Sequence, residues 1–282
     1  MTILSVTVWH QHPDRLFEQL QNYNQAFDGD VMHYVNINAE FADSFAYATR
    51  KRGVDFSQIP NLRFVTPPLR TAWAVVLHAY LQAVLQAMQD RVAFDYVYFH
   101  TSADLMIRRG AAQHIRQFDA GLGKSWRIPG RLEEGELRFE REGSDQLEAI
   151  RQDPAMPGFM AANGFKSLYK CRAEGSFFRR ALFFEAIAPM LAHWSLADMT
   201  RLPAVYPQEE YLLATCLEHY AQRNRIARAR HLVLTSKNEK QHATVEEIDE
   251  ALQDAQVFGI KRFDQKADTP ARRHALGLVA AG

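Results

Sequence analysis

The chain has 282 residues, with 33 Lys and Arg against 33 Asp and Glu, and 47% of its residues are hydrophobic. This composition excludes an intrinsically disordered chain, and zero net charge disfavours nucleic-acid binding through a general positive field. The two cysteines, Cys171 and Cys216, cannot build a disulfide framework, which fits a reducing compartment. The N-terminal apolar run ends at Trp9, too early for a secretory signal or a membrane span, so we expect a soluble, cytoplasmic protein.

Strands and helices are predicted to alternate through the first part of the chain. Strands are expected at residues 3–9, 31–38, 62–65 and 94–100, and helices at 15–27, 71–90 and 111–118. This alternation predicts an α/β fold with a largely parallel sheet. Ligands of such sheets bind beyond the carboxyl ends of the strands, so residues 36–38 and 100–104 are candidate rim positions.

The second part of the chain is less regular. Residues 130–153 are highly charged and are predicted to form a solvated insertion or subdomain. An apolar stretch at 177–194 predicts a strand or turn leading into a helix broken at Pro189, and a further helix is expected at 208–223. Thr244 and Glu247 predict a capped helix at 245–252, and the last dozen residues are expected to form a loose tail.

Three short segments combine residue types that can carry chemistry. Asp104 ends a strongly β-prone strand, Glu209 and Glu210 open a helix, and Lys261 and Arg262 form a cationic pair between apolar residues. Each also has a structural interpretation. Asp104 can cap a turn, the two glutamates can complement a helix dipole, and the cations can be surface charge.

The order of these segments along the chain adds information. The relevant residues are Trp73, Ser102-Ala103-Asp104-Leu105-Met106, Gly175-Ser176-Phe177-Phe178, Pro207 with Glu210 and Thr215, and the run from Phe258 to Asp264. In this order they resemble the motifs of the core-2/I-branching β-1,6-N-acetylglucosaminyltransferase family (glycosyltransferase family 14-like), with Met106 where the family has Pro. The resemblance covers about residues 3–265 and marks the chain as similar to a distant, bacterial-type member.

The resemblance implies an α/β, GT-A-like nucleotide-diphospho-sugar transferase fold. It implies one domain over residues 1–265, with a nucleotide-binding half at about 1–120 and an acceptor and catalytic half at about 121–265, followed by a tail at 266–282. The implied chemistry is inverting and metal-independent, with no cofactor. A sugar, with N-acetylglucosamine as a candidate, would move from a nucleotide-sugar donor, expected to be UDP-linked, to a glycan or lipid-linked acceptor.

The resemblance also assigns roles to residues. Glu210 is the expected catalytic base, with Glu209 as the alternative because the register of the match allows either. Arg262 and Lys261 would bind the donor diphosphate, and Arg228, Arg230 and Lys237 compete to be the second basic partner. Asn38 and Asp104 would line the donor pocket, while Gly175 and Ser176 would bind the acceptor. The expected setting is surface polysaccharide synthesis in the cytoplasm, with no nucleic-acid partner and only peripheral contact with the inner membrane.

Two other interpretations stay open. The first is a metal-dependent nucleotide-sugar enzyme or nucleotidyltransferase of similar fold, with Asp28 and Asp30, which form a D-x-D pattern, or Asp104 as metal ligands. The second is a glycan- or nucleotide-binding module that has the fold without the chemistry. A turn is the simpler interpretation of Asp28 and Asp30, because they precede a predicted strand.

Overall fold

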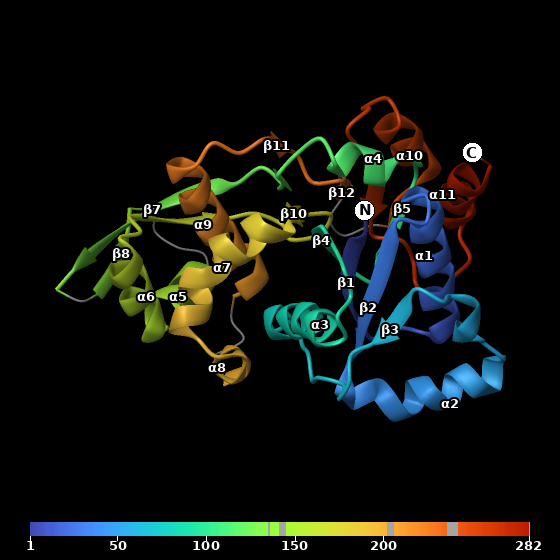
Figure 1. The fold of residues 1–282 in the computed structure, drawn as a ribbon, viewed down its shortest axis with the longest axis horizontal. Coiled ribbons are helices and arrows are strands. Elements are labelled where there is room, and N and C mark those ends of the chain that lie inside the picture. Colours follow the sequence, from blue (N-terminus) through green and yellow to red (C-terminus); the bar gives the residue numbers. More distant parts are fainter. Residues whose placement is uncertain (135, 141–144, 202–205, 236–241, 282) are drawn as a thin grey trace.

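The computed structural model describes residues 1–134, 136–140, 145–201, 206–235 and 242–281. A seven-stranded sheet, in the order β11-β6-β10-β4-β1-β2-β3, forms its centre (Figure 1). The strands are β1 (Ile3–Trp9), β2 (Val31–Ile37), β3 (Leu62–Phe64), β4 (Tyr96–His100), β6 (Ala120–Gly121), β10 (Phe177–Arg179) and β11 (Arg228–Ala229). Strands β3, β2, β1 and β4 are mutually parallel, and β10 is antiparallel to both β4 and β6. The expected α/β class, with a mostly parallel sheet between helices, is confirmed.

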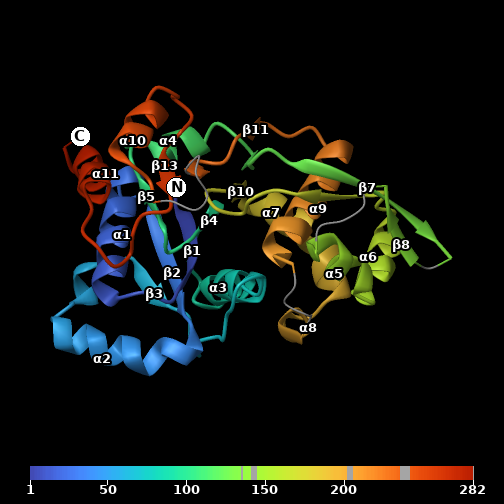
Figure 2. The same ribbon diagram turned by 180° about the vertical axis from the view of Figure 1, so that it is seen from behind.

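Both faces of the parallel strands are covered by helices. In β1, Leu4, Val6 and Val8 belong to the same core cluster as residues of α3 (Leu77–Gln89). Ile3 and Trp9 pack instead with residues of α1 (Pro13–Ala26). Figures 1 and 2 show α1 and α3 on opposite sides of β1 and β2. Burial on both faces explains why apolar residues occur on either side of these strands, and it also covers the polar side chains of Ser5, Thr7, His33 and Asn36.

A second group of elements extends from the β10 side of the sheet (Figure 1). It consists of β7 (Trp126–Glu133), β8 (Glu136–Phe139), β9 (Ser167–Lys170), α5 (Asp145–Gln152), α6 (Ala155–Asn163), α7 (Arg180–His193), α8 (Leu196–Arg201) and α9 (Gln208–Arg223). The charged segment at 130–153 contributes β8 and α5 to this group. Leu137 and Ile150 are buried in the core, so the expectation of a solvated segment is wrong for these side chains. Their apolar faces pack inward, whereas the charged neighbours remain outside.

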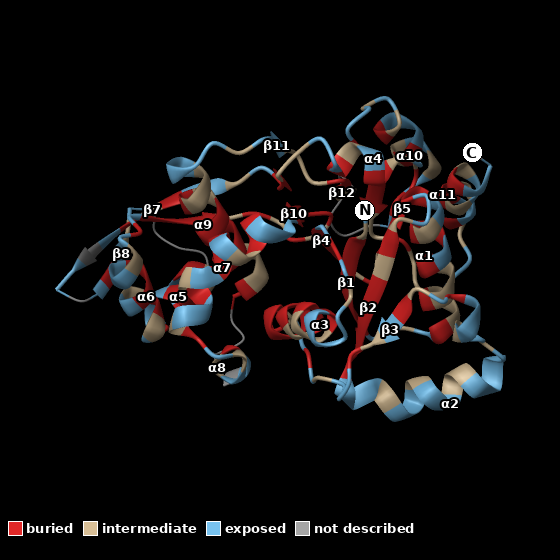
Figure 3. Ribbon diagram, viewed as in Figure 1, coloured by how far each residue is buried: buried red, intermediate tan, exposed pale blue. Residues whose placement is uncertain are grey.

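The helices differ from the sequence expectation at one proline. Pro189 lies inside α7, which continues to His193, so the predicted break at Pro189 is wrong. Leu182, Phe183, Ile187 and Met190 are buried along this helix, and their packing holds it together across the proline. By contrast, α2 (Ala42–Arg52) has no buried residue and lies on the outside, as Figure 3 shows. No helix within the described ranges has the length and apolar character needed to cross a bilayer.

A small sheet and two helices complete the C-terminal part. The small sheet contains β12 (Val233–Thr235), β13 (Gly259–Lys261) and β5 (Asp104–Met106), and the two helices are α10 (Val245–Ala251) and α11 (Pro270–Ala280). The remaining elements lie earlier in the chain and are α4 (Ala111–Ile115) and the 3₁₀ helices η1 (Ala39–Phe41) and η2 (Phe56–Gln58). The predicted capping box of Thr244 and Glu247 is present in α10. The expected loose tail is wrong, because α11 is a helix capped by Thr269. Its Arg272 is 1% exposed and pairs with Glu18 of α1 at 2.8 Å, which fixes α11 on the domain.

Candidate active site

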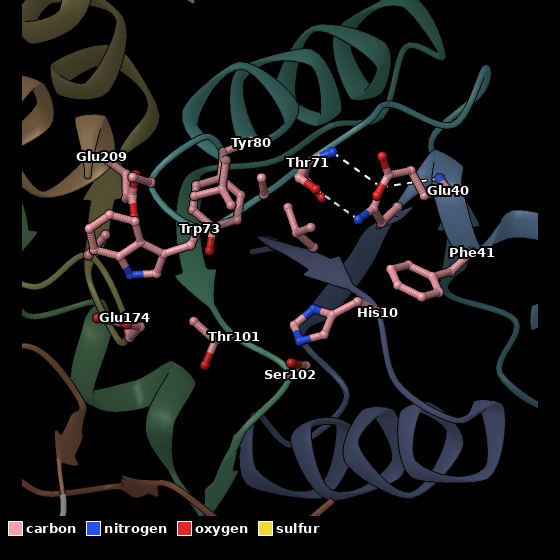
Figure 4. Close-up of a pocket in the computed structure, with 16 residues that line it drawn as sticks. His10, Glu40, Phe41, Thr71, Trp73, Tyr80, Thr101, Ser102, Glu174 and Glu209 are labelled. Atoms are coloured by element: carbon pink, nitrogen blue, oxygen red, sulfur yellow. Dashed lines mark hydrogen bonds between the residues drawn. The ribbon is translucent and has the colours of Figure 1, made fainter. Parts of the chain in front are cut away.

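A cavity of about 460 Å³ opens at the carboxyl ends of β1, β2 and β4. Because these strands are parallel, the residues that follow them meet at one edge of the sheet. His10 follows β1, Asn38 follows β2, and Thr101 and Ser102 follow β4 (Figure 4). Its ionisable lining residues are mainly carboxylic acids: Glu40, Glu174 and Glu209, together with His10. We call this space the acidic cavity.

Asn38 fixes the loop that carries Trp73 into the acidic cavity. Its side-chain amide donates to the carbonyl of Thr71 at 2.8 Å, and its side-chain oxygen accepts from the Thr71 N–H at 3.2 Å. Ala74 has φ of 65°, which a continuous helix does not allow, and α3 starts only at Leu77. The predicted helix start at Thr71 is therefore wrong. The loop leaves Trp73 68% exposed at the cavity wall.

Glu209 is the second residue of α9, and its side chain lines the acidic cavity. Burial raises the pKa of Glu209 to about 8, and the negative charges of Glu210 and Glu174 add to the rise. Its Oε2 atom has no hydrogen-bond partner among the residues that the structure describes. Only the ionised form of this carboxyl group can accept a proton from a bound hydroxyl group, and that form becomes populated as the pH approaches 8.

Glu174 faces the same cavity from the loop between β9 and β10. Figure 4 shows Glu174 and Glu209 close to Trp73, whereas Phe41 and Glu40 lie toward the other side. Burial acts to raise the pKa of Glu174, but the charge and hydrogen bond of Lys261, a backbone hydrogen bond and the charge of Arg172 together lower it overall. Glu174 and Lys261 form an ion pair, with side chains 15% and 18% exposed. The two cavity carboxyl groups thus differ in charge at neutral pH, with Glu174 ionised and Glu209 largely protonated.

Glu210, the first choice of the sequence analysis for the base, points elsewhere. Its carboxylate lies 3.5 Å from the Lys170 ammonium group, and its side chain is not part of the cavity wall. Burial and the charge of Glu174 raise its pKa, while Lys170 opposes the rise. Between the two adjacent glutamates, the helix therefore presents Glu209 to the cavity and Glu210 to Lys170.

A second cavity, of about 560 Å³, adjoins the first. Its ionisable lining residues are His242, Lys261, Arg262, Asp264 and Lys266, and we call it the basic cavity. The backbone N–H groups of Arg262 and Phe263 both donate to the carbonyl of Ala103, at 2.8 and 3.0 Å. Ala103 lines the basic cavity, and its neighbours Thr101 and Ser102 line the acidic one. The hydrogen bonds to Ala103 therefore hold the cationic segment directly beside the carboxyl edge of β4.

Asp104 does not reach either cavity. It is fully buried, and its carboxylate accepts hydrogen bonds from Tyr23 at 2.9 Å, Gln19 at 3.0 Å and the Thr101 N–H at 3.0 Å. These bonds fix the turn after β4 from beneath. The structure therefore gives Asp104 the turn-capping role that the sequence analysis kept as an alternative, and not contact with a ligand in either cavity.

Two of the three candidates for a further cation, Arg228 and Arg230, lie among the described residues. Arg230 pairs with Asp254 at 2.5 Å and Arg228 pairs with Glu218 at 2.6 Å, and neither arginine lines the two cavities. Lys237 lies outside the described residues. Lys266, which the sequence analysis did not single out, lines the basic cavity beside Arg262.

Gly175 and Ser176 are buried behind the site. Gly175 has φ of 76°, and a Cβ atom there would lie 2.6 Å from the backbone nitrogen of Val233. Ser176 is 2% exposed and its hydroxyl group donates to the carbonyl of Arg172 at 3.3 Å. Neither residue lines the acidic or the basic cavity, so the structure does not place them where an acceptor would bind in these two spaces. They shape the turn that presents Glu174.

The D-x-D aspartates lie away from both cavities. Asp28 and Asp30 are in the turn before β2, at the opposite end of that strand from Asn38, and they pair with Arg109 and Arg116. The turn interpretation of these residues is thus confirmed. Within the described ranges, no group of three or more His, Cys, Asp or Glu side chains is placed to hold a metal ion.

Sequence reasoning missed Glu174 and the position of Trp73 at a cavity wall. Glu174 directly precedes the Gly175-Ser176 pair, so the glycine marked the right turn but the acidic neighbour went unnoticed. A glycine that directly follows a charged residue and precedes an apolar run is the sequence signal that could have found it, and the structure shows this glycine with positive φ.

Comparisons with known proteins give low similarity. No family model matches the chain, and no curated protein matches it. Among solved structures, it is similar to the 4-diphosphocytidyl-2C-methyl-D-erythritol synthase of Anaerococcus prevotii, with 11% identity, 90% of this chain and 99% of that chain covered, and a TM-score of 0.43. It is also similar to a nucleoside-diphosphate-sugar pyrophosphorylase of Vibrio cholerae, with 11% identity, 82% and 91% covered, and a TM-score of 0.39. No residue role or activity follows from likeness at this level.

Proposed function

We propose that this chain is an inverting glycosyltransferase that uses a nucleotide-activated sugar, as its resemblance to the core-2/I-branching family implies. The observation that carries the proposal is Glu209, a buried carboxyl group in an acidic, aromatic-lined cavity, with one oxygen that no described residue hydrogen-bonds. The basic cavity beside it supplies the opposite charge. This pairing suits a substrate with an anionic diphosphate at one end and an uncharged sugar at the other.

In this proposal the diphosphate of the donor lies in the basic cavity. Lys261, Arg262 and Lys266 are the cations that would contact its oxygens, with Arg262 able to form paired hydrogen bonds through its guanidinium group. The sugar then extends past Thr101 and Ser102 into the acidic cavity, where Trp73 and Tyr80 offer apolar surfaces. The acceptor, a glycan or lipid-linked hydroxyl compound, enters from the exposed Trp73 side.

The transfer needs one proton acceptor and one stabilised leaving group. The acceptor hydroxyl oxygen attacks the anomeric carbon and forms the new C–O bond, while the bond from that carbon to the diphosphate oxygen breaks. Glu209 in its ionised form takes the hydroxyl proton and becomes neutral, and the nucleoside diphosphate leaves with the electron pair. The cations of the basic cavity stabilise its added negative charge, so we propose that no metal ion is required.

Nucleotidyl transfer is the second candidate. The names of both similar structures, a 4-diphosphocytidyl-2C-methyl-D-erythritol synthase and a nucleoside-diphosphate-sugar pyrophosphorylase, fit this alternative better than glycosyl transfer. TM-scores of 0.43 and 0.39 do not decide between two reactions. Asp104, one ligand that this candidate would use, has its carboxylate engaged with Tyr23 and Gln19.

The test compares both reactions on the same purified protein. One assay supplies a panel of nucleotide sugars with and without acceptors and measures nucleoside diphosphate release in EDTA. The other supplies a nucleoside triphosphate with a sugar 1-phosphate and Mg²⁺ and measures pyrophosphate release. We expect release in the first assay, including slow donor hydrolysis without acceptor. Pyrophosphate release in the second assay alone would establish nucleotidyl transfer, and nucleotide-sugar binding by thermal shift with neither reaction would indicate a binding module.

A further inference from the structure

The Glu174–Lys261 ion pair joins the two cavities. Glu174 lines the acidic cavity, and Lys261 lines the basic one. They are far apart in sequence, and each comes from a different part of the chain, with Lys261 ending β13 and Glu174 preceding β10. The pair therefore forms part of the wall between the two spaces.

The backbone around Glu174 is held by several hydrogen bonds. Gly175 donates to the carbonyl of Phe99 at 2.8 Å and accepts from the Leu232 N–H at 2.9 Å, and Phe99 donates to the carbonyl of Ser176 at 2.9 Å. The contact of Gly175 with Val233 leaves no room for a side chain. The turn is thus fixed between β4 and the segment that enters β12, and only the Glu174 side chain can adjust.

Lys261 is held differently. Its backbone is part of β13 and pairs with Asp104 of β5, but its ammonium group sits at the end of a flexible four-carbon chain. That group can contact Glu174 or an anion in the basic cavity. We propose that a diphosphate in the basic cavity competes with Glu174 for the ammonium group of Lys261, an inference that rests on the proposed diphosphate site. Glu174 is then a positioning residue that links donor binding to the acidic cavity.

The link has a direct electrostatic consequence at Glu209. The charge of Lys261 acts to lower the pKa of Glu209, and the charge of Glu174 acts to raise it. When Lys261 turns to a diphosphate, Glu174 loses its closest counter-charge, although Arg172 still acts on it. The negative charge of Glu174, beside Glu209, is then less compensated by positive charge, which raises the pKa of Glu209. Donor binding is therefore expected to raise the pKa of Glu209, which makes its ionised form a stronger base and lowers the fraction that is ionised.

The experiment uses inorganic pyrophosphate as the probe and needs no turnover. We would measure its affinity for the full chain by titration calorimetry. Glu174→Gln is expected to bind pyrophosphate roughly three- to tenfold more tightly, because Lys261 is released from its carboxylate partner. Glu210→Gln is the matched control, because it removes a nearby carboxylate whose partner is Lys170 and not Lys261. Unchanged or weaker binding in Glu174→Gln, an equal gain in Glu210→Gln, or no pyrophosphate binding by the wild type would each overturn the inference.

A double variant protects the test against misfolding. Glu174→Gln with Lys261→Met removes both charges and leaves no lone buried ion. We expect it to bind pyrophosphate about tenfold or more weakly than Glu174→Gln, and equal binding by the two variants would contradict the inference. Sugar transfer is a separate readout. If transfer occurs without the gain in Glu174→Gln, this inference alone falls, and if the gain occurs without transfer, the proposed reaction alone falls.

Discussion

The two cavities at the carboxyl edge of the sheet differ in both charge and construction. The acidic cavity is lined by residues that follow β1, β2 and β4 and by Glu209 at the start of α9. The basic cavity is lined mainly by one short segment, from Lys261 to Lys266, fastened to Ala103. Carboxylates in the first are drawn from distant segments, whereas cations in the second are neighbours in sequence.

This difference explains how a chain with equal numbers of acidic and basic residues can still present strong local fields. Cations close together in sequence can meet a diphosphate without any basic surface elsewhere. Buried carboxyl groups, in contrast, need neighbours that control their protonation. The pKa of Glu209 is raised and that of Glu174 is lowered, although both face the same cavity. The cavities can therefore be separated experimentally by changing one charge at a time.

Loss of the cavity carboxylate has the largest expected effect. Glu209→Gln should lower the rate of sugar transfer by roughly 10²- to 10⁴-fold, the usual contribution of a general base. The matched variant Glu210→Gln should cost less than about tenfold, because its carboxylate lies against Lys170 outside the cavity. Steady-state rates of nucleoside diphosphate release, with circular dichroism to verify folding, provide the measurement. A larger loss in Glu210→Gln would return the base to the residue that the family resemblance first suggested.

The basic cavity gives the next largest effect. Arg262→Met should weaken binding of a nucleoside diphosphate by roughly 10- to 100-fold, as expected for loss of charge-assisted hydrogen bonds. Arg230→Met is the matched control, because Arg230 pairs with Asp254 outside both cavities. Its affinity should stay within about twofold of the wild type. Calorimetric titration measures both, and equal losses would mean that Arg230 also belongs to the diphosphate site.

The free energy of unfolding is expected to depend on pH with opposite sign for two carboxyl groups of α9, Glu209 and Glu218. Glu209 has a folded pKa of about 8 against an ordinary value of 4.5, so its contribution to stability is full below pH 4.5 and is lost as the pH rises through 8. Glutamine does not ionise, so Glu209→Gln removes this loss of stability at high pH. Each unit by which the folded pKa exceeds the unfolded one corresponds to about 1.4 kcal/mol in the free energy of unfolding. We therefore expect the variant to exceed the wild type in free energy of unfolding by up to a few kcal/mol at pH 9, with little difference at pH 4.

Glu218, on the same helix, provides the opposite case. Burial opposes ionisation of Glu218, but hydrogen bonds from Arg228 and Ser125 lower its pKa overall. Its stabilising contribution is therefore present above its ordinary pKa and is lost as the pH falls. Glu218→Gln should be less stable than the wild type at pH 9. Urea unfolding at pH 4 and pH 9 measures the free energy of unfolding of both variants. If both variants were more stable, or both less stable, than the wild type at pH 9, the opposite pKa shifts of Glu209 and Glu218 would be contradicted.

Much of the fold follows from local sequence signals. The apolar strands, the bounds of α9 and the Thr244–Glu247 capping box depend on residues close together in the chain. The start of α3 does not. Apolar residues keep helical spacing back to Thr71, but hydrogen bonds from Asn38 and the positive φ of Ala74 hold that segment as a loop. Asn38 and Thr71 are distant in sequence, and only the folded sheet brings them together.

The site was predictable to a smaller extent. The sequence could point to the edge of the sheet and to the cationic segment, because parallel strands end together and Lys261 and Arg262 are adjacent, and both places line a cavity in the structure. Which of two adjacent glutamates faces the cavity depends on how α9 packs, and one residue of rotation decides it. Asp104 looked like a ligand residue, yet Gln19 and Tyr23 of α1, distant in sequence, take up its carboxylate.

The smallest expected effect concerns the aromatic wall of the acidic cavity. Trp73 is 68% exposed, so its removal should change the free energy of unfolding by no more than about 0.5 kcal/mol. If a sugar or acceptor ring packs against it, Trp73→Ala should lower kcat/KM by roughly 5- to 10-fold, corresponding to about 1 kcal/mol of lost aromatic contact. Trp126→Ala is the matched control, because Trp126 is 50% exposed and lines neither cavity. An equal loss of activity in both variants would show that the effect of Trp73 does not arise in the cavity, whereas a loss confined to Trp73→Ala would place the substrate on the acidic side of the Glu174–Lys261 wall.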